Sequence, residues 1–185
     1  MKGAETSFQL MTVPGYTGSG PGHWQSIWER GDPGIRRIEQ RDWDRPDLSE
    51  WPRAIDAAVR SAARPVVLLA HSCGVTAVAL WAETYATPVA GAFLVAPADP
   101  DSAAADEMVR AFGPVPLRTL RFPALVVASE DDPYCATSRA ADYARAWGAT
   151  LTSAAAAGHI NTASGHGPWP EGQSLLAAFC SAIGR

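Results

Sequence analysis

Four short apolar segments limit what this chain of 185 residues can fold into. Each segment is nearly continuous in apolar residues rather than alternating, which is typical of strands buried on both faces of a parallel sheet. The segments cover residues 8–13, 66–70, 92–96 and 125–128. Two weaker segments, at residues 35–40 and 149–154, indicate further and more exposed strands.

Segments with helical character separate these predicted strands. They cover residues 22–30, 48–63, 73–85, 138–147 and 171–183. A regular alternation of strands and helices, with right-handed connections, gives a parallel sheet with helices on both faces. We therefore predict a three-layer αβα sandwich. The length fits a single domain over residues 1–185, in which residues 99–117 form a loop with a short helix or partial lid.

The charge balance and the cysteine content exclude several classes of protein. With 15 Lys+Arg against 19 Asp+Glu the net charge is −4, whereas nucleic-acid-binding domains usually carry a basic patch. The 3 cysteines are too few and too far apart for a disulfide framework or a CxxC metal site. No stretch reaches the roughly 18 apolar residues of a membrane span, and the first residues lack the apolar core of a signal peptide. We expect a cytoplasmic protein that contacts neither nucleic acid nor membrane.

Residues 70–74, with the sequence Ala-His-Ser-Cys-Gly, stand directly between a predicted strand and a predicted helix. That context is required of a nucleophile elbow, whose usual pattern is G-x-S-x-G. Only small residues fit two places before and two places after the nucleophile, and Ala70 and Gly74 occupy these places. Ser72 is therefore the candidate nucleophile, at a helix N-terminus that favours developing negative charge. The alternative interpretation is that Ser72 only caps the helix.

An activated serine needs a base, and the chain has 4 histidines. In hydrolases with this elbow the order along the chain is Ser…Asp…His, and the histidine follows the last strand. His159 fits this order best. His166 and His23 are weaker candidates, and His71 is expected to pack at the turn because it adjoins Ser72.

The acid that orients the base should follow the strand predicted at residues 125–128. Asp132 lies there, just before Pro133, and is the favoured acid because it would fix the imidazole tautomer and stabilise the imidazolium. Asp131 is a weaker alternative, and together with Glu130 it is expected to form a solvated turn. Asp99, which follows the preceding strand, is a further candidate.

An acyl-transfer site also needs donors for the oxyanion. One is the backbone N–H of the residue after the nucleophile, here Cys73, and the other comes from the loop after the first strand. In that loop, residues 14–22 contain four glycines, and the backbone N–H of Tyr16 is the natural second donor. The loop lacks the Lys of a GxxxxGK[ST] motif and the spacing of GxGxxG, which argues against nucleotide binding.

With these residues in place, the sequence resembles the retinoblastoma-binding protein nine / YdeN family of small serine hydrolases in the α/β-hydrolase superfamily. The resemblance runs over nearly the whole chain. It rests on residues 13–29, 40–46, 70–74, 94–99, 122–134, 147–149 and 157–172. It implies a reduced hydrolase fold with about six parallel strands and no large cap, a triad of Ser72, Asp132 and His159, and no metal or cofactor. The L-x-C-x-E motif that contacts the retinoblastoma protein does not occur, so that partner is not expected.

These features together predict a carboxylesterase that acts on small acyl esters through an acyl-enzyme intermediate. The alternatives are a peptidase or amidase that acts on short substrates, and a catalytically weak protein-binding module on the same fold. Loop aromatics at the carboxyl ends of strands, Trp43, Tyr134 and Trp169, are candidate contacts for a small ester or amide substrate. His23 matches the family pattern and either shapes the pocket or braces the first loop. The sequence leaves the oligomeric state open.

Overall fold

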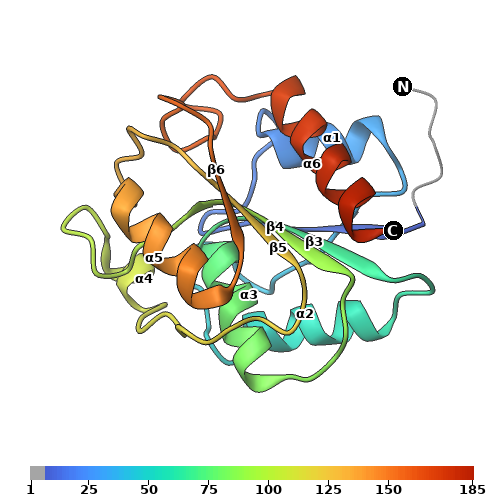
Figure 1. The fold of residues 1–185 in the computed structure, drawn as a ribbon. Helices are drawn as coiled ribbons and strands as arrows, with labels where there is room; N and C mark the ends of the chain where they lie inside the picture. Colours follow the sequence, from blue (N-terminus) through green and yellow to red (C-terminus); the bar gives the residue numbers. More distant parts are fainter. Residues whose placement is uncertain (1–6) are drawn as a thin grey trace.

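The computed structural model describes residues 7–185 and is built around one sheet of six parallel strands (Figure 1). The strands are β1 (Gln9–Val13), β2 (Arg36–Arg37), β3 (Val66–Ser72), β4 (Gly91–Pro97), β5 (Ala124–Ala128) and β6 (Thr150–Ser153). Their order across the sheet is β2-β1-β3-β4-β5-β6. The strand order changes direction between β1 and β3, and open α/β sheets bind ligands in the crevice at such a point.

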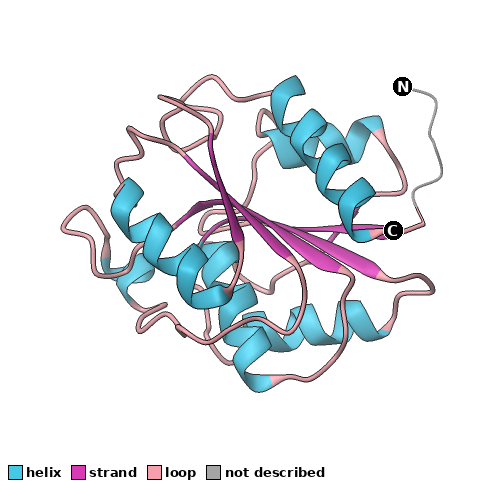
Figure 2. Ribbon diagram, viewed as in Figure 1, coloured by secondary structure: helices cyan, strands magenta, loops and turns pink. Residues whose placement is uncertain are grey.

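Helices cover both faces of the sheet. They are α1 (Trp24–Gly31), α2 (Glu50–Arg60), α3 (Cys73–Thr84), α4 (Glu107–Arg110), α5 (Thr137–Trp147) and α6 (Pro170–Ile183). α1 and α6 form one layer, and α2, α3 and α5 form the other (Figures 1 and 2). The predicted three-layer sandwich without a large cap is confirmed, since only α4 lies between β4 and β5. None of the helices within residues 7–185 is both long and apolar enough to span a membrane.

The central strands are apolar on both faces because each face is covered by a helical layer. Along β3, Leu68 and Ala70 belong to the core that includes α2, α3 and α5. Val67 and Leu69 point the other way, into the core shared with α1 and α6. Successive residues of a strand point to opposite faces, so a strand with two buried faces reads as a continuous apolar segment.

The strand expected at residues 35–40 is much shorter than predicted. Only Arg36 and Arg37 pair with β1, and a single further bond runs from the Ile38 N–H to the carbonyl of Thr12. β2 is an edge strand with two charged residues, and the Arg37 guanidinium bonds Glu29 on α1 instead of facing solvent. β2 is therefore an edge strand of two residues.

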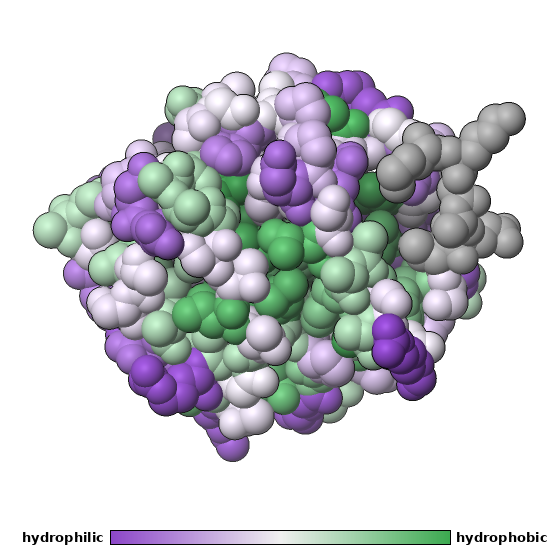
Figure 3. All heavy atoms as spheres, turned by 45° about the horizontal axis from the view of Figure 1, so that its top comes forward, coloured by the Kyte–Doolittle hydropathy of each residue, from purple (hydrophilic) through white to green (hydrophobic). Residues whose placement is uncertain are grey.

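The opposite edge of the sheet is open. Strand β6 is largely exposed, and Leu151 near its middle is 39% exposed. A cavity of about 770 Å³ lies beside the end of β6 and is bounded by residues 153–157 and, among others, Trp169 and Leu175. Figure 3 shows apolar residues gathered in the middle of one face of the molecule.

Replacing Gly74 with alanine is expected to destabilise the fold strongly. A Cβ atom at this position would lie 2.1 Å from the carbonyl oxygen of Val13 and 2.7 Å from that of Pro14. Both are backbone atoms that no side-chain rotation can move, so we expect a loss of about 3 kcal/mol, the upper end of ordinary overpacking. Urea unfolding measures this loss, with Gly20→Ala as the control because a Cβ at Gly20 meets no atom within 4 Å. Equal free energies of unfolding for the two variants would contradict the prediction.

Candidate active site

Ser72 lies at the sharp turn where β3 passes into α3. Its backbone has φ 56° and ψ −125°, a conformation that costs a non-glycine residue roughly 1–3 kcal/mol. Ser72 holds the N-cap position of α3, but its side chain makes no capping hydrogen bond. The hydroxyl is therefore available for other partners, which argues against a simple capping role.

The loop after β1 packs directly on this turn. A Cβ atom at Gly15 would lie 2.9 Å from Cβ of Ser72 and 3.1 Å from the backbone nitrogen of Cys73, so only glycine allows this approach. The backbone N–H of Tyr16 lies beside the Cys73 sulfur. The structure thus brings Tyr16 and Cys73, the two residues predicted to donate backbone N–H groups to an oxyanion, together next to Ser72.

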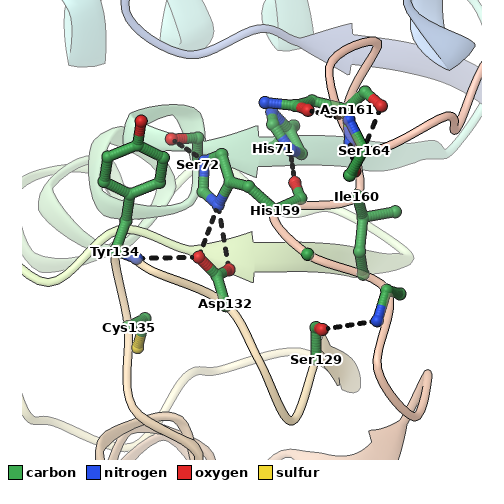
Figure 4. A network of polar contacts seen from close by, with 12 residues as sticks. His71, Ser72, Ser129, Asp132, Tyr134, Cys135, His159, Ile160, Asn161 and Ser164 are labelled. Atoms are coloured by element: carbon green, nitrogen blue, oxygen red, sulfur yellow. Dashed lines mark hydrogen bonds and ion pairs between the residues drawn. The ribbon is translucent and has the colours of Figure 1, made fainter.

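Ser72, His159 and Asp132 form a continuous polar chain (Figure 4). Ser72 Oγ lies 2.9 Å from Nε2 of His159. Nδ1 of the same ring lies 3.0 Å and 2.9 Å from the two carboxylate oxygens of Asp132. The side chains of His159 and Asp132 are only 8% and 2% exposed. With its proton on Nδ1, the imidazole donates to Asp132 and leaves Nε2 to accept the hydroxyl proton of Ser72.

The sheet explains why residues so far apart in the chain meet. Ser72 is the last residue of β3, Asp132 follows β5, and His159 follows β6. All six strands are parallel, so their carboxyl ends lie at the same edge. Residues that are far apart in the sequence therefore meet at this edge, because each lies at the carboxyl end of a strand.

The alternative acid and base residues bond elsewhere. Asp99 accepts hydrogen bonds from the Arg139 guanidinium at 3.3 Å and from the Tyr143 hydroxyl at 3.2 Å. His166 contacts the Ser164 hydroxyl through Nδ1 at 3.2 Å. Neither Asp99 nor His166 therefore joins the chain that starts at Ser72.

Asp131 lies in an exposed turn, as predicted, but its carboxylate also has hydrogen-bond partners there. Its carboxylate accepts a hydrogen bond from the Ser129 hydroxyl at 2.7 Å and one from the backbone N–H of Gly158 at 2.7 Å. These two bonds hold the pKa of Asp131 below its ordinary value. The sequence carries no signal for such a contact, because the partner in the second bond is a backbone group of a distant loop.

Three imidazole rings lie next to one another beside Ser72, in edge-on and tilted arrangements. The ring centroids of His23 and His71 lie 4.6 Å apart, and those of His71 and His159 lie 4.9 Å apart. Nε2 of His71 lies 2.9 Å from the carbonyl oxygen of His159, and because a carbonyl only accepts, His71 donates a proton through Nε2. His71 therefore packs at the turn, as its position beside Ser72 predicts.

The two inner histidines are held neutral by burial. Burial, together with the neighbouring His23 and His159, holds the pKa of His71 well below its ordinary value. Burial also lowers the pKa of His23 from 6.5 to about 4. Nδ1 of His23 accepts the backbone N–H of Gln25 at 3.2 Å, whereas its Nε2 is buried without a hydrogen-bond partner.

Tyr134 lies against the triad, and Trp43 lies against the loop after β1. The Tyr134 ring stands against the His159 ring in a T-shaped arrangement, with the centroids 4.7 Å apart, and Tyr134 is 42% exposed. Trp43 is half-buried and its ring lies against Gly18 of the loop after β1. The carbonyl of Trp43 accepts the backbone N–H of Thr17 at 2.9 Å, so Trp43 braces that loop.

The other two residues predicted to touch substrate are core residues. Trp169 is 4% exposed and packs against Trp24 and Trp28, with ring centroids 5.3 Å and 5.9 Å away. Its backbone takes a left-handed conformation at the start of α6, and its ring lies between helices rather than at a rim. His23 is 5% exposed and caps α1, so of its two predicted roles the structure shows the bracing one.

The three cysteine thiols are buried away from solvent. Cys73, Cys135 and Cys180 are free and buried. Burial raises the pKa of the Cys73 thiol to about 11, which keeps it protonated and unreactive near neutral pH. Among residues 7–185, no three His, Cys, Asp or Glu side chains lie so that they could hold a metal ion.

Comparisons with known proteins give matches over most of the chain. The family model described as "Serine hydrolase" matches residues 10–178. A solved structure of a YdeN-like hydrolase from Pectobacterium atrosepticum is 36% identical, with a TM-score of 0.84 over 95% of this chain and 92% of that chain. The ydeN gene product from B. subtilis is 21% identical, with a TM-score of 0.76 over 94% and 99% of the two chains. The esterase domain of a Rhodothermus marinus protein is 17% identical, with a TM-score of 0.69 over 97% and 89%. The last two show the fold alone, and no curated protein matches the chain.

The buried histidines predict that stability falls as the pH drops from about 6.5 towards 4. The pKa of both His23 and His71 is lower in the fold than the ordinary 6.5, so in this window the unfolded chain binds protons that the native chain does not. Each imidazole then removes up to about 1.4 kcal/mol of stability per pH unit. Urea unfolding at pH 7.5, 6.0 and 5.0 measures the slope. His23→Asn keeps a capping acceptor for α1 and should reduce the slope; an unchanged slope would contradict the prediction.

Proposed function

The chain belongs to the serine hydrolase family, as its resemblance to the YdeN-like hydrolases implied, and we propose that Ser72, His159 and Asp132 are its catalytic triad. The observation that carries this proposal is the pair of contacts on the His159 ring. One ring nitrogen meets the Ser72 hydroxyl at 2.9 Å and the other meets the Asp132 carboxylate. Acyl transfer needs a serine that a base activates, and here a buried carboxylate orients that base.

In the proposed reaction, His159 Nε2 takes the hydroxyl proton while Ser72 Oγ bonds to the carbonyl carbon of an ester. The backbone N–H groups of Cys73 and Tyr16 stabilise the oxyanion. As the bond from the carbonyl carbon to the leaving oxygen breaks, His159 gives its proton to the departing alcohol. Water then attacks the acyl-enzyme and passes a proton to His159, which returns it to Ser72 as the acid product leaves.

We propose a small acyl ester as the substrate class. The segment between β4 and β5 contains only the four residues of α4 as a helix, so no large cap encloses a long acyl chain above Ser72. Esterases occur among the structural neighbours, although at an identity that speaks for the fold alone. Turnover of p-nitrophenyl esters of increasing chain length, beside a panel of aminoacyl anilides, tests this choice. Faster turnover of the anilides would favour a peptidase, and no turnover of either panel would favour a binding module.

Replacing Ser72 with alanine is expected to abolish labelling by a fluorophosphonate probe. In that reaction Ser72 Oγ bonds to phosphorus, fluoride leaves, and the hydroxyl proton passes to His159. We expect ester hydrolysis by Ser72→Ala to fall by about 10⁴-fold or more, as when a triad serine is removed elsewhere. Ser174→Ala is the matched control, since the Ser174 hydroxyl donates to the carbonyl of Pro170 within α6. Equal labelling of Ser72→Ala and the wild type would show that the nucleophile is another residue.

Tyr134→Ala is expected to raise KM because its exposed ring stands beside His159, where a bound ester would lie. The loss of an aromatic contact worth about 0.5–1.5 kcal/mol corresponds to an increase of roughly 2-fold to 12-fold. Leu117→Ala is the control, since Leu117 is also exposed but lies before β5, at the amino end of that strand. A KM for Tyr134→Ala equal to that of the control would exclude Tyr134 from the substrate site.

A further inference from the structure

Two pairs of adjacent residues bind the segment of residues 157–160, which we call the His159 segment. Each pair contacts both the His159 ring and the main chain of this segment. In the pair His71-Ser72, Ser72 contacts the imidazole and His71 donates to the main-chain carbonyl of His159. In the pair Asp131-Asp132, Asp132 contacts the imidazole and Asp131 accepts from the main-chain N–H of Gly158. In each pair the second residue bonds the ring and the first bonds the backbone that carries the ring.

The bond from His71 is buried and directional. His71 is 5% exposed, and its Nε2 lies 2.9 Å from the carbonyl oxygen of His159. Its ring is packed between those of His23 and His159, which fixes the direction of the N–H group. Figure 4 shows His71 above the His159 carbonyl, on the side away from Asp132.

The bond from Asp131 is part of a small network at the end of β5. Asp131 accepts from Gly158 N–H at 2.7 Å and from Ser129 Oγ at 2.7 Å. Ser129, which is 1% exposed, in turn accepts the backbone N–H of Ala157 at 2.9 Å. The loop after β5 therefore binds two successive N–H groups that precede His159.

The His159 segment needs such contacts because its backbone is unusual. Gly158 and Ile160, on either side of His159, both have positive φ, at 56° and 47°. A non-glycine residue such as Ile160 takes this conformation at a cost, so contacts from outside the segment must maintain it. The direction of the His159 side chain follows from the backbone on both sides of it.

We propose that His71 and Asp131 are positioning residues that set the backbone of His159 and thereby align its ring between Ser72 and Asp132. The proposal rests on the triad proposed above. Errors of about 1 Å in the placement of reacting groups can cost about 100-fold in rate, and preorganised sites depend on such supporting hydrogen bonds. Loss of either residue should therefore lower kcat and leave KM nearly unchanged.

The experiment compares two substitutions at each position. His71→Gln keeps an N–H donor at a similar reach and His71→Phe removes it; Asp131→Asn keeps an acceptor oxygen and Asp131→Ala removes it. We expect kcat for p-nitrophenyl acetate, and the rate at which a fluorophosphonate labels Ser72, to fall by about 10-fold to 100-fold in His71→Phe and Asp131→Ala. The conservative variants should recover most of this loss. Glu130→Ala is the control, because Glu130 is exposed and its side chain bonds Ser153.

The outcomes separate this inference from the triad. If Ser72 of the wild type reacts with the probe while His71→Phe and Asp131→Ala retain the wild-type kcat, the positioning role is wrong and the triad stands. If Ser72 of the wild type does not react, both proposals fail. A rise in KM without a fall in kcat would also overturn the positioning role, because it would indicate a substrate contact. Asp131 is exposed, so Asp131→Ala decides the matter if circular dichroism shows His71→Phe to be unfolded.

Discussion

The backbone turn at Ser72 depends on close contacts that only glycine permits. Gly74 lies so near the carbonyl groups of Val13 and Pro14 that a single added carbon would overlap them, and Gly15, the next residue of that segment, lies against Ser72 itself. These contacts hold Ser72 at a positive φ, where its hydroxyl leaves the end of β3 and faces a histidine instead of capping α3. Packing against the end of β1 thus offsets the backbone strain at Ser72. The position of the Ser72 hydroxyl therefore depends on β1 as well as on β3.

The remaining groups reach the site because all six strands of the sheet are parallel. The helices that connect parallel strands cover both faces of the sheet, and the carboxyl ends of the strands lie at a common edge. The polar groups that meet there follow different strands, so the 2.9 Å contact between Ser72 and His159 depends on the relative placement of β3 and β6 with two strands between them. The local sequence determines which polar groups follow each strand, and the sheet determines the distances between these groups.

The sequence is informative where one local rule dominates. The apolar segments, the turn around Ser72 and the order Ser…Asp…His led to the observed sheet and to the three residues that meet in it. The strand predicted at residues 35–40 was too long, since only Arg36 and Arg37 pair with β1. Trp169 was placed at the rim because it is a loop aromatic, whereas its left-handed backbone puts the ring among other tryptophans. The contact of Asp131 with Gly158 was not predicted, because its partner is a main-chain N–H group and the identity of a residue does not reveal what its main chain bonds.

The 7 tryptophans divide between the two sides of the sheet. Trp24, Trp28 and Trp169 belong to the side of α1 and α6, and Trp43, Trp51, Trp81 and Trp147 belong to the other side. Intrinsic fluorescence therefore comes from two separate layers of one molecule. Replacing the tryptophans of one layer with phenylalanine leaves an optical reporter confined to the other, so the order in which the two layers form during folding can be followed without an added dye.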